Sequence, residues 1–543
     1  MPAPGDERAA PAAADDQAKR PRTTGEEERK KLAGRAGIVA AGTLLSRLLG
    51  LARDVVLAAV FSRDATDAFF VAFTLPNMLR QILGEGAVSS AVMPVLSKKL
   101  EEGDLPARDF FRKARGVSLL ALVIVTGLGM AFARPLTELF ASGFHARPGQ
   151  FERTVELTRT VFPYIFFMGS AALGMAALNA KRRFAVAAFA PGLLNVAFLV
   201  AAFALPAAFA ARGIDPAQVL AAGALVGGLL QVIAQWPSLS RLGYLGLPRL
   251  DLRDPAVRDM LRRIAPMTLG IGVYYIDLML SRRFLSEMGE GAQSYFTWAQ
   301  RLADFPQGIF VMAISTAALP SLSTLAARGE MDEVKKTFAH GMRLSMFVAI
   351  PSSVALAAMG EPIVALLFQR GAFDALSTQE TARAAMWQGG AIFTVAAVRQ
   401  TIPVFHALGD TRTPVWVSAT DLVVFVALAY FLRERMGHAG VSAAVAGSSL
   451  VQMALLLVML RLRLGGLAAA EMLPSIGKTT AASALGAVGG ASVARLIGPG
   501  AVAGVASVVV FAGLFFLAGW GLRSPEQDEI LGGVARRLRR RRS

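Results

Sequence analysis

Cysteine is absent from the 543 residues of this chain, and histidine occurs only four times. The absence of cysteine excludes disulfides, thiol catalysis and cysteine-ligated metal sites. The histidines, at positions 145, 340, 406 and 438, are scattered without the spacing of a metal site. No nucleophile motif, phosphate-binding loop or zinc signature is present, so we predict a protein that is not an enzyme and holds no metal or organic cofactor.

Charge is also scarce, because only 17% of the residues are charged whereas 54% are hydrophobic. The mean hydropathy of +0.50 is too high for a soluble protein of this length and predicts a polytopic membrane protein. Basic residues outnumber acidic ones by 56 to 39, for a formal charge of +17. They lie in short clusters between apolar segments, which indicates cytoplasmic loops rather than nucleic-acid binding.

Long hydrophobic runs recur along most of the chain. A spanning helix needs about 20 largely apolar residues. By this measure the sequence predicts an all-α integral membrane protein with 14 transmembrane helices, at 36–60, 66–96, 116–134, 160–180, 185–209, 217–240, 264–286, 293–325, 338–359, 384–406, 414–432, 440–462, 474–495 and 500–522. Charges and prolines interrupt the second and the eighth of these segments.

Alternate loops between the segments are rich in lysine and arginine, as expected on the cytoplasmic side of a membrane. We therefore predict that both termini are cytoplasmic. Residues 1–35 mix proline, alanine and charges of both signs, which predicts a disordered tail. No cleavage site follows a short apolar run, so we expect the first helix to be retained. The arginine-rich stretch at 536–542 predicts a basic tail attracted to anionic lipid.

Two stretches resemble each other at a nearly constant offset. QILGEGAVSSAVMPVLS at 81–97 aligns with QGIFVMAISTAALPSLS at 307–323, and PLTELFASGF from residue 135 resembles PIVALLFQRGAF from residue 362. Ordered matches across six helices indicate two parallel, pseudo-symmetric lobes of six helices with a substrate between them. The predicted parts are an N-lobe at 36–243, a linker at 244–263, a C-lobe at 264–463, two further helices within 464–523 and a tail at 524–543.

Charged side chains occur well inside these apolar runs, although each arginine or aspartate at a membrane centre costs about 2.5–3.5 kcal/mol. At 100° per residue, Arg47 and Asp54 lie on one stripe of the first helix, with Ser46 and Arg53 on the adjacent face. Arginine suits phosphate because its planar fork donates two hydrogen bonds and keeps its charge. We predict an anion site formed by Arg47, Arg53, Arg80 and Arg301, with Ser46, Asp54, Asn77, Glu85 and Asp304 around it.

These segments resemble a known family. SRLLGLARD, TDAFF and AFTLPNMLRQILGEGAVSSAVMPVL, with RLADFPQGI in the second lobe, are similar to motifs of the MurJ (MviN) family of lipid II flippases in the MOP exporter superfamily. The resemblance covers about 36–523. It implies a V-shaped, MATE-like transporter of the bacterial inner membrane that moves lipid II, the undecaprenyl-diphosphate-linked peptidoglycan precursor, to the outer leaflet by alternating access for cell-wall synthesis.

The resemblance also implies roles for particular residues. It assigns substrate binding to Arg47, Arg53, Arg80 and Arg301, supporting roles to Ser46, Asp54, Asp67 and Glu85, and a lipid-tail groove to residues 474–522. Some members of the family bind sodium through carboxylates, which makes Asp277 and Asp421 a candidate site for a coupling cation, Na⁺ or H⁺. Helix capping or a water-lined kink explains these two aspartates equally well. The membrane potential is a second candidate energy source, and we expect a monomer that contacts membrane lipids.

Other interpretations remain open at this stage. The intramembrane arginines could form structural ion pairs, as Arg53 beside Asp54 permits, and Arg399 in the tenth helix is as consistent with a structural role as with function. Three other functions would also fit a polytopic protein. A polysaccharide-repeat (Wzx-like) flippase would share the two lobes, a multidrug exporter should have an acidic cavity, and a membrane-embedded glycosyltransferase or scaffold would not transport.

Overall fold

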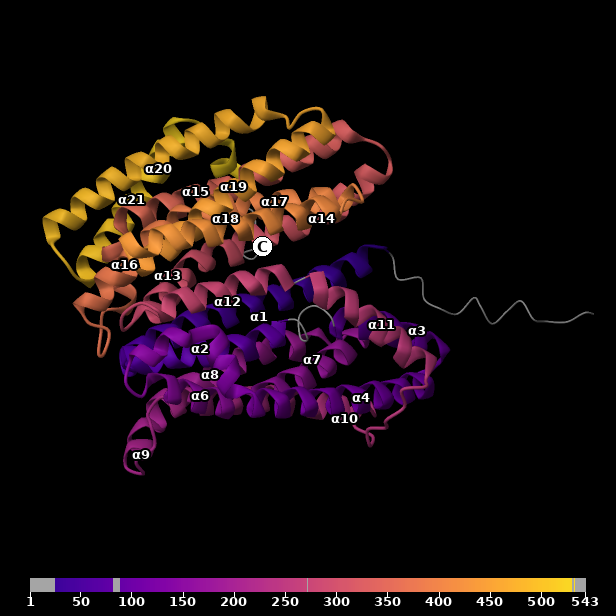
Figure 1. The fold of residues 1–543 in the computed structure, drawn as a ribbon. Coiled ribbons are helices and arrows are strands. Elements are labelled where there is room, and N and C mark those ends of the chain that lie inside the picture. Colours follow the sequence, from indigo (N-terminus) through magenta and orange to yellow (C-terminus); the bar gives the residue numbers. More distant parts are fainter. Residues whose placement is uncertain (1–24, 82–87, 271, 530–531, 533–543) are drawn as a thin grey trace, which may run out of the picture.

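The computed structural model describes residues 25–81, 88–270, 272–529 and 532. Within this part of the chain, the regular elements are helices, and none of the described residues forms a strand. Figure 1 shows two stacked layers of long helices that run in roughly the same direction. The indigo-to-magenta helices α1 to α12 form one layer, and the helices from α13 onward form the other.

The first layer contains α1 (Gly25–Val60), α2 (Arg63–Arg80), α3 (Val88–Glu102), α4 (Asp104–Ala131), α5 (Ala133–Ala141), the 3₁₀ turn η2 (Ser142–Ala146), α6 (Gln150–Val161), α7 (Tyr164–Ala180), α8 (Phe184–Ala204), α9 (Pro206–Ala210), α10 (Gln218–Arg241), α11 (Pro255–Gly270) and α12 (Gly272–Ser286). Helix α12 packs on α5 of its own layer and also on α18 of the other layer. It therefore connects the two layers.

The second layer contains α13 (Ala292–Pro306), the π-helical turn η3 (Gln307–Val311), α14 (Met312–Ala327), α15 (Met331–Phe368), α16 (Ala375–Gly390), α17 (Ile392–Ala407), α18 (Arg412–Met436), α19 (His438–Leu464), α20 (Ala469–Ile497) and α21 (Ala501–Gly521). We call the end of the bundle at which α1 ends the distal end, and the end at which α1 begins the proximal end. The loops at 61–62, 287–291 and 369–374 are distal.

Ten helical segments of the described chain are long and apolar enough to cross a membrane: Asp104–Ala131, Gln150–Ala180, Phe184–Ala204, Gln218–Arg241, Ala292–Ala327, Met331–Phe368, Arg412–Met436, His438–Leu464, Ala469–Ile497 and Ala501–Gly521. The predicted all-helical, multi-pass membrane protein is thereby confirmed. Large apolar side chains on the outer helices, such as Phe431, Leu496 and Trp520, are 70% to 86% exposed. Lipid can cover such side chains without the cost that water would impose.

The remaining four predicted spans fall on helices that carry charges or are interrupted. The prediction 36–60 lies in α1, 66–96 is divided between α2 and α3, 264–286 between α11 and α12, and 384–406 between α16 and α17. Helix α1 begins at Gly25, earlier than predicted, because the segment EEERKK consists of good helix formers. Residues 1–24, and 536–542 of the predicted basic tail, lie outside the described part of the chain.

The linker between the predicted lobes is held against the first layer. Lys113 of α4 pairs with Asp109 at 2.8 Å and reaches into the linker to Asp254 at 2.8 Å and Asp251 at 3.6 Å. The backbone N–H of Arg249 donates to a carbonyl of α4 at 3.1 Å. Residues 244–254 therefore run along α4 at the proximal end rather than hanging free between the layers.

Candidate functional site

The polar residues of α1 face α8 and the second layer. The guanidinium of Arg53 donates two hydrogen bonds to Asp54, at 2.6 and 2.8 Å, and a third to Asn195 of α8 at 3.0 Å. The ring of Phe198 lies under the same guanidinium, 5.5 Å away. In turn, Asn195 donates to the backbone carbonyl of Ser46 at 2.9 Å. These contacts fix the direction of Arg53 and leave one oxygen of Asp54 for another partner.

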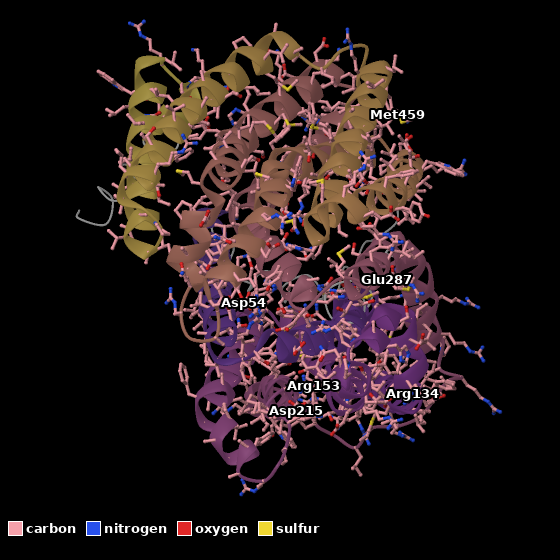
Figure 2. The ribbon with its side chains drawn as sticks, turned by 60° about the vertical axis from the view of Figure 1, so that its left-hand side comes forward. Asp54, Arg134, Arg153, Asp215, Glu287 and Met459 are labelled. Carbon is pink, nitrogen blue, oxygen red and sulfur yellow. The ribbon has the colours of Figure 1, made fainter. Side chains whose placement is uncertain are left out.

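That partner comes from the second layer. The Nε of Arg301 in α13 lies 3.6 Å from the second carboxylate oxygen of Asp54, whose side chain is only 6% exposed. The side chain of Arg301 itself is 43% exposed. Figure 2 shows Asp54 where the purple layer meets the orange one. An ion pair between the first and eighth predicted helices therefore joins the layers in the middle of the bundle.

A second carboxylate extends this group of charges. Asp304 of α13 interacts electrostatically with Arg301, Arg399 and Arg47. Together Arg47, Arg53, Asp54, Arg301, Asp304 and Arg399 form what we call the arginine cluster. Four guanidinium groups against two carboxylates leave two positive charges uncompensated within it. Such an excess inside apolar helices requires water or an anion.

The members of the cluster lie at different depths in the bundle. Asp54 and Arg47 lie six and thirteen residues before the distal end of α1, and Arg301 lies nine residues into α13. At a rise of 1.5 Å per residue these positions are about 9, 20 and 14 Å from the distal end. The charges are therefore well inside the helices rather than at their ends, where charged residues are common.

Arg47 crosses from the first layer to the π-helical turn η3. A Cβ atom placed on Gly308 would lie 1.7 Å from Nη1 of Arg47 and 2.4 Å from its Cζ. Only a glycine allows this guanidinium to rest on the backbone of η3. The Nε of Arg47 is buried and has no hydrogen-bond partner among the described residues. The wide turn of η3 follows Pro306, which cannot supply a backbone N–H to a regular helix.

The predicted residues of the second helix are only partly placed. Arg80, in the last turn of α2, donates from Nε to Asn77 at 3.0 Å, so the predicted i,i+3 neighbours are in contact. Glu85 lies outside the described residues. The structure therefore brings Arg47, Arg53 and Arg301 together with Asp54 and Asp304, whereas the contact with Asn77 places Arg80 at the end of α2.

Asp67 lies at the distal end, apart from the cluster, and is fully buried. Its carboxylate accepts hydrogen bonds from the backbone N–H groups of Gly291 and Ser294, at 2.8 and 2.9 Å, and from the Ser294 hydroxyl at 2.7 Å. These donors form the first turn of α13, whose N–H groups have no partner within the helix. Arg147 adds a further contact to Asp67 at 3.0 Å. Asp67 of α2 thus caps a helix of the other layer.

Other contacts close the distal end as well. Arg63 reaches Glu290 at 3.5 Å, Asp374 at 3.3 Å and the hydroxyl of Tyr295 at 3.1 Å. Asp374 caps α16, and the hydrogen bond from the Ser377 backbone N–H lowers the pKa of Asp374 below its usual value. Its carboxylate therefore stays charged for Arg63 down to pH values below the usual Asp range.

The same closure involves the backbone. Gly371 has a φ of +58° and lies so close to the Ala59 carbonyl that an added Cβ would be 2.2 Å from its oxygen. The next N–H, that of Ala372, donates to the Ala59 carbonyl at 2.8 Å. Contacts between the layers at the distal end thus include backbone, hydroxyl and charged groups, and the two layers are joined there.

The chain is similar to known proteins over most of its length. The family model described as lipid II flippase MurJ matches residues 57–508. The chain belongs to the MurJ family of lipid II flippases. The probable lipid II flippase MurJ of Bdellovibrio bacteriovorus is 34% identical over 441 residues, which cover 80% of this chain and 83% of that protein. The family predicted from the motifs is therefore confirmed.

Solved structures agree on the fold. A lipid II flippase MurJ in an inward closed conformation superimposes with a TM-score of 0.72, at 20% identity, over 89% of this chain and 97% of that one. An inward-facing MATE multidrug transporter of the MOP superfamily superimposes with a TM-score of 0.65, at 14% identity. The match covers 79% of this chain and 98% of that one. The MurJ-like and MATE-like fold predicted from the sequence is confirmed.

Several residues of the site had no role assigned from the sequence. Arg63 and Arg147 lie near helix ends, where charges are frequent, so nothing in the sequence distinguishes them from ordinary loop residues. Arg399 did carry a signal, because it interrupts an apolar run, and in the structure its charge interacts with that of Asp304. Asn195 and Gly308 are uncharged, and only the packing of α8 and η3 on α1 reveals them.

The candidate cation residues lie together elsewhere. Asp277 of α12 and Asp421 of α18 interact electrostatically, and Ser448 of α19 lies beside Asp421. One carboxylate oxygen of each aspartate is buried without a hydrogen-bond partner among the described residues. Two carboxylates and a hydroxyl from three helices provide some of the oxygen ligands that a hard cation prefers. The other ligands are not evident among the described residues.

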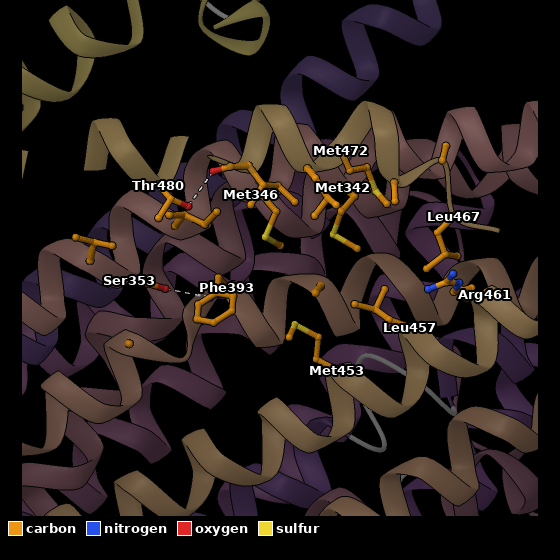
Figure 3. Close-up of a pocket in the computed structure, with 18 of the residues that line it drawn as sticks. Met342, Met346, Ser353, Phe393, Met453, Leu457, Arg461, Leu467, Met472 and Thr480 are labelled. Carbon is orange, nitrogen blue, oxygen red and sulfur yellow. Dashed lines mark hydrogen bonds between the residues drawn. The ribbon is translucent and has the colours of Figure 1, made fainter. Parts of the chain in front are cut away.

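An apolar cavity of about 790 Å³ opens in the second layer between α15, α17, α19 and α20. Figure 3 shows methionines and leucines lining it, with Arg461 at one end. The predicted lipid-tail groove at 474–522 overlaps this cavity in α20, at Ile476 and Thr480, whereas its described lining includes no residue of α21.

Proposed function

We propose that this protein translocates lipid II across the inner membrane by alternating access, without covalent chemistry. The observation that carries this proposal is the arginine cluster, with two uncompensated positive charges inside a MurJ-type fold. A diphosphate has the charge and the multiple oxygens that paired guanidinium groups recognise. Arg47, Arg53 and Arg301 would hold it, with Arg80 reached from α2, while Ser46, Asp54, Asn77 and Asp304 position them.

The proposed topology has 14 spans and places both termini in the cytoplasm. The ten apolar segments are complemented by α1, α2 with α3, α11 with α12, and α16 with α17. The basic loops then lie on the proximal side, which would be cytoplasmic. We expect the protein to work as a monomer, because each lobe supplies arginines to a single cluster.

In this arrangement the structure corresponds to a state closed toward the outside. The distal contacts of Asp67, Arg63 and Gly371 separate the arginine cluster from the distal surface. Lipid II would enter from the proximal side with its polyprenyl chain remaining in lipid or in the groove beside α20. Rocking of the lobes would then break the distal contacts and release the head group outside.

The membrane potential could drive both the outward movement of the loaded protein and the return of the empty protein. Complete transfer of two negative charges toward an outside-positive face would gain about 4–5 kcal/mol per 100 mV, less the part that the arginines shield. The empty cluster is positively charged, and the same field would return it toward the cytoplasm. A cation bound at Asp277 and Asp421 is a second proposed source of energy.

The proposal is tested by a leaflet-specific lipid II protection assay in cells depleted of their own flippase. We expect this protein to restore lipid II at the outer leaflet and to restore growth. An abundant, membrane-inserted protein that leaves lipid II on the inner leaflet would contradict the proposal. Rescue of polysaccharide-repeat export instead would favour the Wzx-like alternative. The basic cluster argues against a multidrug exporter of cations.

The cation proposal makes a separate prediction. In proteoliposomes we expect Na⁺ or a proton gradient to stimulate transport, and Asp421→Asn to abolish that stimulation while lowering transport about tenfold, since a hard cation loses a charged ligand. Asp259→Asn, on the exposed proximal part of α11, is the matched control. An unchanged ion response in the Asp421 variant would show that the two aspartates have a structural role only.

A further inference from the structure

A smaller cavity of about 460 Å³ lies in the first layer between α1, α7 and α8. We call it the side cavity. Its lining includes Thr43, Ser46 and Arg47 from α1, and Asn179 from the proximal end of α7. The other wall is the first half of α8, beginning at Phe184. The side cavity therefore lies on the proximal side of the arginine cluster and shares Arg47 with it.

The lining of the side cavity is polar on one side and apolar on the other. The hydroxyls of Thr43 and Ser46 and the amide of Asn179 can each donate and accept hydrogen bonds. Phe184, Ala187 and Pro191 of α8 provide an apolar surface. Among the described residues that line it none is acidic, and Arg47 is the one basic residue. A ligand with a ring of hydroxyl and amide groups and an apolar face would match this surface.

The side cavity is also held in shape. At its edge α1 and α8 approach so closely that a Cβ on Gly42 would lie 2.7 Å from the backbone oxygen of Ala188. Further along the same two helices, Asn195 ties Arg53 to the Ser46 carbonyl. A wall fixed in this way needs little reorganisation to accept a ligand. Its volume lies within the roughly 300–1,000 Å³ of small-molecule pockets.

We propose that the side cavity binds the N-acetylated sugar that is joined directly to the diphosphate of the substrate. This inference rests on the proposed function. Arg47 contributes to the cluster and lines the side cavity, so a diphosphate in the cluster has its attached group within reach of Thr43, Ser46 and Asn179. The complete disaccharide with its peptide is too large for this volume, so the second sugar and the peptide extend outside it.

A lipid chain fits the side cavity less well. An acyl chain offers no hydrogen bond to the Ser46 hydroxyl, the Asn179 amide or the Arg47 guanidinium, and covering a polar group without one costs about 1–3 kcal/mol. The groove beside α20, lined by methionines and leucines, is the more suitable surface for a chain. The side cavity thus adds a polar, sugar-binding part next to the charged part of the site.

The test compares two ligands that differ only in the head group, lipid II and undecaprenyl diphosphate, by equilibrium binding to the purified full-length protein. Ala187→Phe should fill the side cavity and Asn179→Leu should remove its amide. We expect each variant to weaken lipid II binding about tenfold, the effect of losing one or two hydrogen bonds, while binding of undecaprenyl diphosphate stays within about twofold. Ala185→Phe, an exposed position of the same helix, is the control.

The outcomes separate this inference from the proposed function. Equal weakening of both ligands by Ala187→Phe and Asn179→Leu, or no weakening of either, would overturn the sugar site. Arg301→Glu should weaken both ligands. If the unaltered protein bound neither ligand, the proposed function itself would fail. Unchanged melting temperatures of the two variants, measured without ligand, establish that a selective loss is not caused by misfolding.

Discussion

Arg301→Glu should abolish complementation of a flippase-depleted strain and lower lipid II transport more than about a hundredfold. Asp54 is only 6% exposed and would lose its partner from the second layer, although Arg301 itself is 43% exposed. The reversal places a third carboxylate beside Asp54 and Asp304 and turns the cluster from two uncompensated positive charges to none. The anion would then meet a site with no net attraction for it.

The matched control is Arg328→Glu. Arg328 ends α14, is largely exposed and lies outside the arginine cluster, with a weak contact to Glu330 at 4.0 Å. The Arg328→Glu protein should insert into the membrane and transport lipid II normally, apart from any small effect of the changed loop charge. Equal membrane abundance of both variants is measured by immunoblot. Normal growth of the Arg301 variant would show that the cluster does not bind the transported group.

A disulfide between the layers at the distal end should stop transport completely and reversibly. Thr66 of α2 and Ser294 of α13 are buried, and their hydroxyl oxygens lie 2.7 Å apart. Replacing both by cysteine brings the two sulfur atoms within the short reach that a disulfide requires. The natural chain contains no cysteine, so the introduced pair is the only one that can form.

We expect the oxidised Thr66→Cys, Ser294→Cys protein to lose transport and to regain it on reduction, as measured in proteoliposomes alongside the fraction cross-linked. Thr137→Cys with Thr158→Cys is the matched control, because these two buried hydroxyls lie 3.4 Å apart within the first layer. A bond there should leave transport unchanged. Full activity of the cross-linked distal pair would mean that the layers need not separate at this end.

The fold class and half of the site could be predicted from the sequence, because their signals are local. Apolar runs of membrane length predict helices, and a charged residue inside such a run can be identified from the sequence before its partner is known. Arg47, Arg53, Asp54, Arg301 and Asp304 therefore stand out in the sequence as charges inside apolar runs, and the structure brings them together. Helical periodicity alone places Arg47 and Asp54 on one face of α1, and Arg301 and Asp304 on one face of α13.

Helix interruptions were harder to predict. Hydropathy averages over a window and treats 160–180 as one segment, whereas the regular helix is interrupted at Phe162 and Pro163 between α6 and α7. Met359 likewise has non-helical dihedral angles inside α15, three residues before Pro362. Such interruptions break the regular helix without changing its hydrophobicity, so composition carries little trace of them.

What the amino-acid sequence determined by itself is the membrane class, the helical composition and which charges need a polar environment. The tertiary structure alone decided their partners: Asp67 caps α13 from a distance of more than 220 residues, Arg47 rests on Gly308, and the charge of Arg399 acts on Asp304. The physical reason is that the cost of burying a charge is a property of one residue, whereas its compensation depends on which distant groups the packed helices bring to it.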